Sequence, residues 1–182
     1  MKKSPWGLTG AGLVLLLALA MVRPASAKDG LEAGGDILQI LLPATAYGLT
    51  WLEEDPKGRS AFTYSFATTL AITYGLKLGV HKERPGGGEM AFPSGHTSAA
   101  FSGAAFITRR YGWRLGLPAY LGALLVGHSR IKAEKHDPED VFAGALIGIL
   151  PTLWLTPGKL EPPNLGLILD HDRAGLVWAV RW

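Results

Sequence analysis

Three short clusters in this 182-residue sequence carry polar side chains suited to phosphate chemistry. The first contains Lys77 and Arg84, which are seven residues apart and followed by a proline. The Arg84 guanidinium offers a planar fork to two phosphate oxygens, whereas Lys77 acts more as a point charge. A helix that continued to Glu83 would place both cations on one face. This cluster therefore predicts a cationic phosphate-binding position near a helix end.

The second cluster is Pro93-Ser94-Gly95-His96. Ser94 is a good N-cap for a helix that begins near His96, and Gly95 allows backbone N–H groups to approach an anion closely. On the first helical turn, the dipole lowers the pKa of His96, whereas a bound phosphate dianion raises it again. The cluster predicts an anion site at a helix N-terminus, with His96 as a general acid.

The third cluster contains Arg130, His136 and Asp140. His136 and Asp140 are four residues apart, so their side chains can meet at the start of a helix. Asp137 and Pro138 suit the cap and the first turn of that helix. Asp140 can accept a hydrogen bond from one imidazole nitrogen, which leaves the other as a nucleophile or a base.

Each cluster alone also fits a plainer interpretation. The first could be a solvated basic helix end, the second a capping serine beside a surface histidine, and the third an ordinary Asp–His pair. Together they supply three fixed cations, a helix N-terminus, two histidines and a carboxylate, with no metal-ligand spacing. That set suits in-line displacement at a phosphate monoester or anhydride, and no metal or cofactor is expected.

Five uncharged runs must position these clusters. They are 15 to 19 residues long, rich in Ala and Leu, and do not alternate apolar with polar residues, which favours helices over strands. About 17–25 apolar residues span a bilayer, so the runs fit either short membrane helices or the buried helices of a soluble bundle. The predicted fold is an all-α bundle of about five core helices, membrane-embedded or membrane-associated. The runs are 37–52, 60–76, 90–108, 115–129 and 141–158.

The order of the runs groups the polar clusters. If five helices run up and down, segments 77–96 and 130–140 share one end, and segments 53–59 and 109–114 share the other. Three arginines in segment 109–114 favour the cytoplasmic side of a membrane. The phosphate-binding end would then face the periplasm.

Composition and charge exclude several classes of protein. The sequence is 48% hydrophobic and 18% charged, and it contains no cysteine, which excludes disulfide scaffolds, thiol nucleophiles and thiolate zinc sites. Its formal charge of +3 is accounted for by Lys2, Lys3 and Arg23. These residues flank the apolar stretch 11–22, which is followed by the small-residue site Ala25-Ser26-Ala27. Segment 1–27 is thus predicted to be a secretory signal peptide, with an uncleaved anchor as the alternative. The charge gives no reason to expect nucleic-acid binding.

Three regions follow from this pattern. Residues 1–27 form the signal peptide, residues 28–158 the helical phosphatase domain, and residues 159–182 a C-terminal tail. In the tail, segments 165–169 and 175–182 could pair as a hairpin around His171-Asp172-Arg173.

The three clusters, in this order, resemble the signature of the type 2 phosphatidic acid phosphatase superfamily, which also includes class A acid phosphatases and vanadium haloperoxidases. The resemblance runs from roughly Ser60 to Leu150. It implies an all-helical fold and metal-independent dephosphorylation. It also implies that His136 is the nucleophile that forms a phosphohistidine, that Asp140 orients it, and that His96 protonates the leaving oxygen. The residues implied to hold the phosphate are Lys77, Arg84, Ser94, Gly95 and Arg130.

The resulting hypothesis is an exported lipid phosphatase in the inner membrane, with its active site facing the periplasm. Its substrate would be an isoprenoid phosphate, a glycerolipid phosphate or lipid A. One alternative is a soluble periplasmic acid phosphatase that takes small phosphate esters. Another is a vanadate-dependent haloperoxidase, since vanadate would occupy the same cage of cations.

Overall fold

The protein is described from a computed structural model, which describes residues 27–158, 164–170 and 173–179. These residues form five α-helices and one pair of strands, so the predicted all-α bundle is confirmed. Residues 1–26 of the predicted signal peptide lie outside the described residues. The helices are α2 (Ala27–Leu52), α3 (Pro56–Gly79), α4 (Gly95–Tyr111), α5 (Trp113–Lys132) and α6 (Pro138–Leu155).

Three helices begin at capping side chains. Asp55 caps α3 by accepting a hydrogen bond from the Gly58 N–H at 2.9 Å. Ser94 caps α4, and Asp137 caps α6 in a capping box with Asp140, as the sequence predicts. These side chains satisfy N–H groups that have no partner within the helix, and so they fix where each helix starts.

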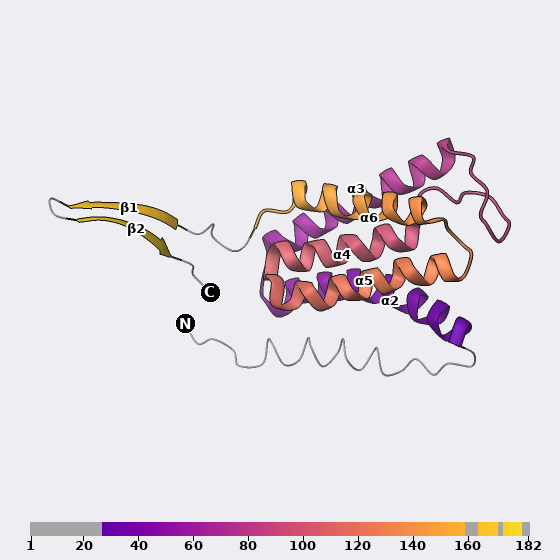
Figure 1. Ribbon diagram of the computed structural model, residues 1–182, viewed down its shortest axis with the longest axis horizontal. Coiled ribbons are helices and arrows are strands. Elements are labelled where there is room, and N and C mark those ends of the chain that lie inside the picture. Colours follow the sequence, from indigo (N-terminus) through magenta and orange to yellow (C-terminus); the bar gives the residue numbers. More distant parts are fainter. Residues whose placement is uncertain (1–26, 159–163, 171–172, 180–182) are drawn as a thin grey trace.

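The helices run alternately up and down, as predicted from the order of the uncharged runs. The start of α2, the loop 80–94 and the α5–α6 connection lie at one end of the bundle, on the right in Figure 1. The α2–α3 and α4–α5 turns lie at the opposite end. We call the first end the active end, because it holds the predicted phosphate-binding residues.

Helix α4 is the central element of the bundle. It contacts each of the other four helices, and every side chain from Thr97 to Ile107 is buried. Glycines bring neighbouring backbones close to it: a Cβ on Gly103 would lie 2.7 Å from the Leu42 carbonyl carbon of α2. A Cβ on Gly148 of α6 would lie 2.5 Å from the Ser98 carbonyl oxygen. Small residues at these positions let the helix backbones approach closely.

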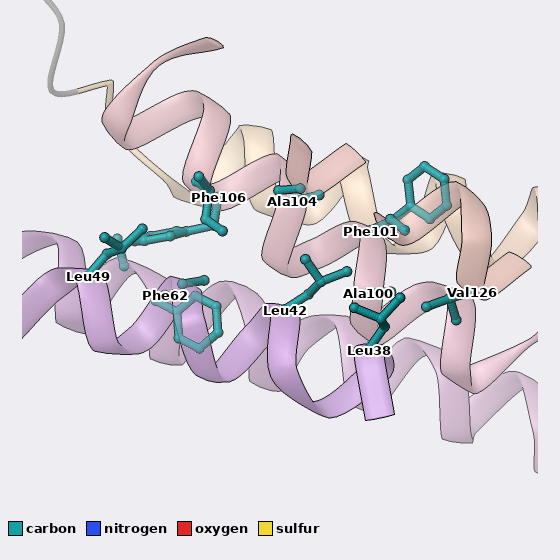
Figure 2. Close-up of a cluster of buried hydrophobic side chains, with 14 residues drawn as sticks. Leu38, Leu42, Leu49, Phe62, Ala100, Phe101, Ala104, Phe106 and Val126 are labelled. Carbon is teal, nitrogen blue, oxygen red and sulfur yellow. The ribbon is translucent and has the colours of Figure 1, made fainter. Parts of the chain in front are cut away.

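The hydrophobic core lies around α4. Figure 2 shows leucines of α2 facing the alanines and phenylalanines of α4, with Phe62 of α3 beside them. The Phe62 and Phe106 rings meet edge to face, with centroids 5.0 Å apart. Buried hydroxyls add polar links between helices, from Thr73 to Ser98 and from Ser102 to Thr152, both at 2.9 Å.

At the end of the bundle opposite the active end, a buried ion pair joins neighbouring elements. Arg110, at the end of α4, donates two hydrogen bonds of 2.6 Å to the Asp55 carboxylate. Arg110 also donates to the Pro157 carbonyl at 2.9 Å. Because Asp55 caps α3 as well, one carboxylate fixes the α2–α3 turn to α4 and to the segment after α6.

The predicted C-terminal hairpin is confirmed over its described residues. Strand β1 (Asn164–Asp170) pairs antiparallel with β2 (Arg173–Ala179). The register runs from the pair of Asn164 and Ala179 to the pair of Asp170 and Arg173.

We expect Asp55→Ala to lower the free energy of unfolding by about 3–5 kcal/mol, because it leaves the Arg110 charge buried without its partner. Thermal unfolding followed by circular dichroism would measure this change. The control is Glu54→Gln, which removes an exposed carboxylate next to Asp55 and should cost less than about 0.5 kcal/mol. Equal melting temperatures for the two variants would contradict the assigned role of the pair.

Candidate active site

The active end encloses a cavity of about 980 Å³. Six of the eight predicted site residues line it: Lys77, Arg84, Gly95, His96, Arg130 and His136. The other two, Ser94 and Asp140, are fully buried. The Ser94 N–H donates a hydrogen bond of 2.9 Å to the Asp140 carbonyl, which joins the second predicted cluster to the third. The structure therefore brings all eight residues into one site.

The position of Arg84 differs from the prediction. Helix α3 ends at Gly79, so Arg84 does not share a helical face with Lys77. The helix ends before Val80, whose backbone is extended, and Pro85 disfavours helical backbone at Arg84 itself. Arg84 instead belongs to a tight turn, in which its N–H donates to the Gly88 carbonyl at 2.8 Å. The loop 80–94 thus brings this guanidinium to the cavity.

The cations of the cavity retain donors for an anion. The Arg84 Nε is buried and has no hydrogen-bond partner among the described residues. Lys77 Nζ donates to the Met90 carbonyl at 2.7 Å, which leaves further ammonium protons available. A buried N–H group that has no hydrogen-bond acceptor destabilises the folded protein, and a phosphate oxygen would supply the missing acceptor.

The start of α4 has the geometry of an anion site. The Ser94 hydroxyl accepts from the Thr97 N–H at 3.4 Å. A Cβ on Gly95 would lie 3.6 Å from the Lys77 Cε, so a glycine keeps the first turn open beside this lysine. The positive end of the helix dipole and the free N–H groups of this turn favour a bound phosphate.

His136 and Asp140 meet, but at a longer distance than a hydrogen bond. The His136 Nδ1 lies 3.7 Å from the Asp140 Oδ2, and it is buried without a hydrogen-bond partner among the described residues. His136 precedes α6, while Asp140 lies on its first turn, where its Oδ2 accepts from the Asp137 N–H at 3.0 Å. The carboxylate therefore serves the helix cap and faces the imidazole at once.

Lys82 is a site residue that the sequence analysis missed. Its Nζ lies 2.8 Å from the Asp140 Oδ1, 2.6 Å from a Glu139 oxygen and 2.9 Å from an Asp137 oxygen. Partial burial lowers the pKa of Lys82, but its hydrogen bonds to these carboxylates outweigh that effect and raise it. Lys82 remains charged and neutralises the buried Asp140. The sequence did contain one indication of this role, because Lys82 lies between Lys77 and Arg84, the two cations of the first cluster.

Asp36 is the second residue that was missed. It lies on α2, and its Oδ1 is 3.0 Å from the His96 Nε2 and 2.8 Å from an Arg130 Nη1. Its signal in the sequence was its position: a carboxylate directly before the uncharged run 37–52, at the end of the bundle that holds the three clusters.

The environment makes both histidines weaker bases than usual. Burial and the nearby Lys77 ammonium lower the pKa of His136 to about 4. Burial and the Arg130 guanidinium lower the pKa of His96, while the Asp36 carboxylate opposes this change. At neutral pH His136 is therefore neutral, as a nitrogen nucleophile must be. Within the described part of the chain, no three His, Asp or Glu side chains form a group that could hold a metal ion.

Residues 58–160 match the family model described as the PAP2 superfamily. The chain belongs to this superfamily. The resemblance predicted from the three motifs is thus confirmed, as is the assignment to a family of phosphate hydrolases. The matched residues of this PAP2 protein include all eight predicted site residues, whereas Asp36 precedes the match.

Two curated relatives and one solved structure resemble this PAP2 protein. Lipid A 4'-phosphatase of Helicobacter pylori is 31% identical over 155 residues, which cover 77% of this chain and 78% of the relative. Lipid A 1-phosphatase of Porphyromonas gingivalis is 35% identical over 106 residues, covering 52% of this chain and 24% of the relative. The crystal structure of Aquifex aeolicus LpxE is 22% identical, with a TM-score of 0.62, and covers 79% of this chain and 92% of that chain. This structural likeness shows the shared fold.

If His136 is the nucleophile and His96 the general acid, kcat/KM should be highest on the acid side of neutrality. Activity is lost as the pH falls through the pKa of His136, about 4, because the nucleophile becomes protonated. It is also lost as the pH rises through the lowered pKa of His96, because the acid loses its proton. A pH profile with a soluble phosphate ester measures both limbs, and an alkaline optimum would contradict these roles.

Proposed function

We propose that this PAP2 protein removes a phosphate group from a membrane lipid, without a metal ion and through a phosphohistidine. The observation that carries the proposal is the shape of the cavity. One continuous space joins the cationic phosphate site at Lys77, Arg84 and Arg130 to an apolar groove between α2 and α3. A phosphate on a hydrocarbon-bearing molecule matches both parts of this space.

The apolar groove follows one face of each helix. On α3 its lining residues recur every four positions, which places them in one stripe. From Phe62 to Lys77 the helix rises about 22 Å, more than the depth of one leaflet of a bilayer whose core is about 30 Å thick. Stacked rings of Phe62 and Phe66, with centroids 5.3 Å apart, close the far end. The residues that line the groove are Ile40, Pro43, Ala44, Tyr47, Phe62, Phe66, Leu70 and Tyr74.

In the first step, His136 attacks the phosphorus atom. Its Nδ1 faces Asp140, so Nε2 forms the bond to phosphorus while the bond from phosphorus to the lipid oxygen breaks. His96 gives its proton to that oxygen. Lys77, Arg84, Arg130 and the first N–H groups of α4 neutralise the charge on the other phosphate oxygens.

In the second step, water releases the phosphate. His96, now neutral, accepts a proton from a water molecule whose oxygen attacks the phosphorus atom. The bond between phosphorus and His136 breaks, inorganic phosphate leaves, and both histidines return to their starting protonation states. The same two side chains thus serve both half-reactions.

Lipid A is the substrate that we propose. Both curated relatives described above are lipid A phosphatases by name, and one of them matches over most of its length. An isoprenoid phosphate or a glycerolipid phosphate would satisfy the same cavity, because the phosphate site and the groove contact only the features that these lipids share.

A belt of exposed apolar side chains supports a membrane location. On α5, Leu117, Leu121 and Leu124 are each more than half exposed, and on α6 so are Phe142 and Leu150. Water-soluble proteins rarely expose apolar patches of this extent. From Phe142 to Leu150 helix α6 rises about 12 Å, which is less than the roughly 30 Å core of a bilayer. The belt reaches the level of the first turn of α4, because Phe142 lies on α6 between Asp140 and Gly144, which both approach Ser94.

Aromatic and basic residues support the proposed orientation. Trp51, Trp113 and Trp154 are 58%, 67% and 86% exposed and lie together at the end opposite the active end. Tryptophans of this kind anchor proteins at membrane interfaces. With Arg109 and Arg114 at the same end, the positive-inside rule places it in the cytoplasm and the active site at the periplasmic face of the inner membrane.

One observation favours a second candidate, a soluble periplasmic phosphatase of broad specificity. Among the described helices, α6 alone has the length and apolar composition to cross a membrane. Cell fractionation distinguishes the two candidates. Retention of the protein in membranes washed at high salt and high pH supports the lipid phosphatase, and release by osmotic shock without detergent supports the soluble enzyme.

We expect His136→Ala to lower kcat by at least about a thousandfold, because the covalent intermediate cannot form. Labelled phosphate should be trapped on the wild-type protein by an alkaline quench and be absent from the variant. His81→Ala is the matched control, since His81 is an exposed loop residue, and it should retain both labelling and turnover. Labelling of the His136→Ala protein would overturn the mechanism.

The substrate class is tested by a panel of lipid A, phosphatidic acid, an isoprenyl diphosphate and p-nitrophenyl phosphate. We expect kcat/KM to be highest for lipid A. We also expect Ala44→Trp, which fills the groove, to reduce kcat/KM for the lipids by about tenfold or more while sparing p-nitrophenyl phosphate. Ala67→Trp places the same side chain on the exposed surface of α3, outside the groove. Equal effects of both variants on all substrates would contradict the assigned groove.

A further inference from the structure

Asp36 lies between two groups of the proposed phosphate site. Its Oδ1 is 3.0 Å from the His96 Nε2 and 2.8 Å from an Arg130 Nη1. It comes from α2, whereas the motif residues come from α3, α4, α5, α6 and the loops between them. It also precedes residues 58–160, which match the PAP2 superfamily. Its contacts therefore add a group to the site that the family motifs do not contain.

We propose that Asp36 is a positioning residue for His96. Its carboxylate holds the imidazole through Nε2, so that Nδ1 delivers the proton to the leaving oxygen. This inference rests on the proposed phosphatase function. It adds to the pair of His136 and Asp140 a second carboxylate–imidazole pair, one for the acid and one for the nucleophile.

The contact suits both half-reactions. In protonated His96 both ring nitrogens donate, and a carboxylate that accepts from Nε2 favours this charged form. After the proton leaves from Nδ1, the neutral ring keeps its remaining proton on Nε2, where Asp36 continues to accept it. The Nδ1 lone pair is then free to take a proton from the attacking water. One ring orientation thus serves as acid and then as base.

Asp36 and a phosphate can occupy Arg130 together. A guanidinium has five N–H donors. In the described structure three of them are used, by the Ser129 hydroxyl at 3.1 Å, the Glu32 carbonyl at 2.9 Å and the Asp36 carboxylate at 2.8 Å. Two N–H donors remain for phosphate oxygens. Substrate binding therefore does not require Asp36 to leave His96.

The surroundings of His96 make this one carboxylate important. Arg130 and Arg84 lower the pKa of His96, and Asp36, the carboxylate in contact with the ring, opposes them. Without Asp36, a smaller fraction of His96 would hold a proton at a given pH. The charged and titratable groups at the cavity are Glu32 and Asp36 on α2, Lys77 on α3, Arg84 in loop 80–94, Arg130 on α5, and Lys135 and His136 before α6.

The test is Asp36→Asn in the full-length protein, assayed with an alkyl phosphate lipid and with p-nitrophenyl phosphate. For the lipid, whose leaving group needs a proton, we expect kcat to fall about 10- to 100-fold, with KM changed less than about threefold. For p-nitrophenyl phosphate, whose leaving group needs little protonation, the rate of phosphoenzyme formation should fall less than about threefold, because only the later attack of water uses His96 as a base. The alkaline limb of the lipid pH profile should move to lower pH.

Two comparisons separate positioning from a general loss of charge or structure. Glu32→Gln removes a carboxylate one turn earlier on α2, where it pairs with Lys135 at 3.5 Å rather than with His96. Its alkaline limb should move much less than that of Asp36→Asn. In a His96→Ala background, Asp36→Asn should cause no further loss, because both changes remove the same function. Asp36→Glu, which keeps the charge, should recover the alkaline limb in part.

Several results would overturn the inference. An equal fall in the rate of phosphoenzyme formation with both substrates, an unmoved alkaline limb, or additive losses in the His96→Ala background would each do so. A lower KM at unchanged kcat would show instead that Asp36 competes with phosphate for Arg130. If the wild-type protein hydrolyses no phosphate ester, the proposed function itself fails. An active wild type, an inactive His136→Ala and a normal Asp36→Asn would refute this inference alone.

A measurement on the wild-type protein does not depend on the variant folding. Nitrogen NMR of histidine-labelled protein, assigned with His96→Ala, reports which ring nitrogen of neutral His96 carries the proton. We expect the proton on Nε2, facing Asp36, and a titration of His96 at lower pH in Asp36→Asn. A proton on Nδ1 in the neutral wild-type ring would contradict the inference.

Discussion

The concentration of positive charge at one end of the bundle constrains the rest of the structure. Lys77, Arg84 and Arg130 face one cavity, and like charges repel more strongly in a partly buried site than in water. The Asp36 carboxylate offsets part of this repulsion, because it pairs with Arg130. The Asp140 carboxylate pairs with a fourth cation, Lys82. The remaining positive charge and the unpartnered donors are what a phosphate would neutralise. The same charges keep both histidines from being strong bases, which suits a neutral nucleophile.

The packing around α4 holds these charges in place. Because α4 is built from small side chains, its neighbours approach its backbone closely, and its first turn lies at the centre of the active end. A Cβ on Gly144 of α6 would lie 2.5 Å from the Ser94 carbonyl oxygen, so α6, which begins just after His136, is in direct contact with the start of α4. The distances among the site residues thus depend on glycines that lie outside the three clusters. The ion pair of Asp55 and Arg110 fixes the other end of the same helices.

Much of this arrangement could be predicted from local sequence. The capping roles of Ser94 and Asp137 depend on side chains next to the helices that they start, and both are confirmed. The number of helices followed from the uncharged runs, and their alternation was enough to place the three motifs at one end. The shared helical face of Lys77 and Arg84 depended on a helix that continued to Glu83; α3 ends at Gly79, yet both side chains line the cavity.

The sequence by itself determined the helices, their caps, their order and the motif residues, because these depend on neighbours within a few positions along the chain. Only the tertiary structure decided that Asp36 contacts His96, since 60 residues separate them, and that Lys82 contacts Asp140, since 58 residues separate those two. The groove between α2 and α3 could likewise be found only in the tertiary structure. Its two walls are apolar helix faces, and in the sequence such faces cannot be told from those that pack into the core. Which apolar face is covered depends on how helices pack, and local periodicity carries no information about that choice.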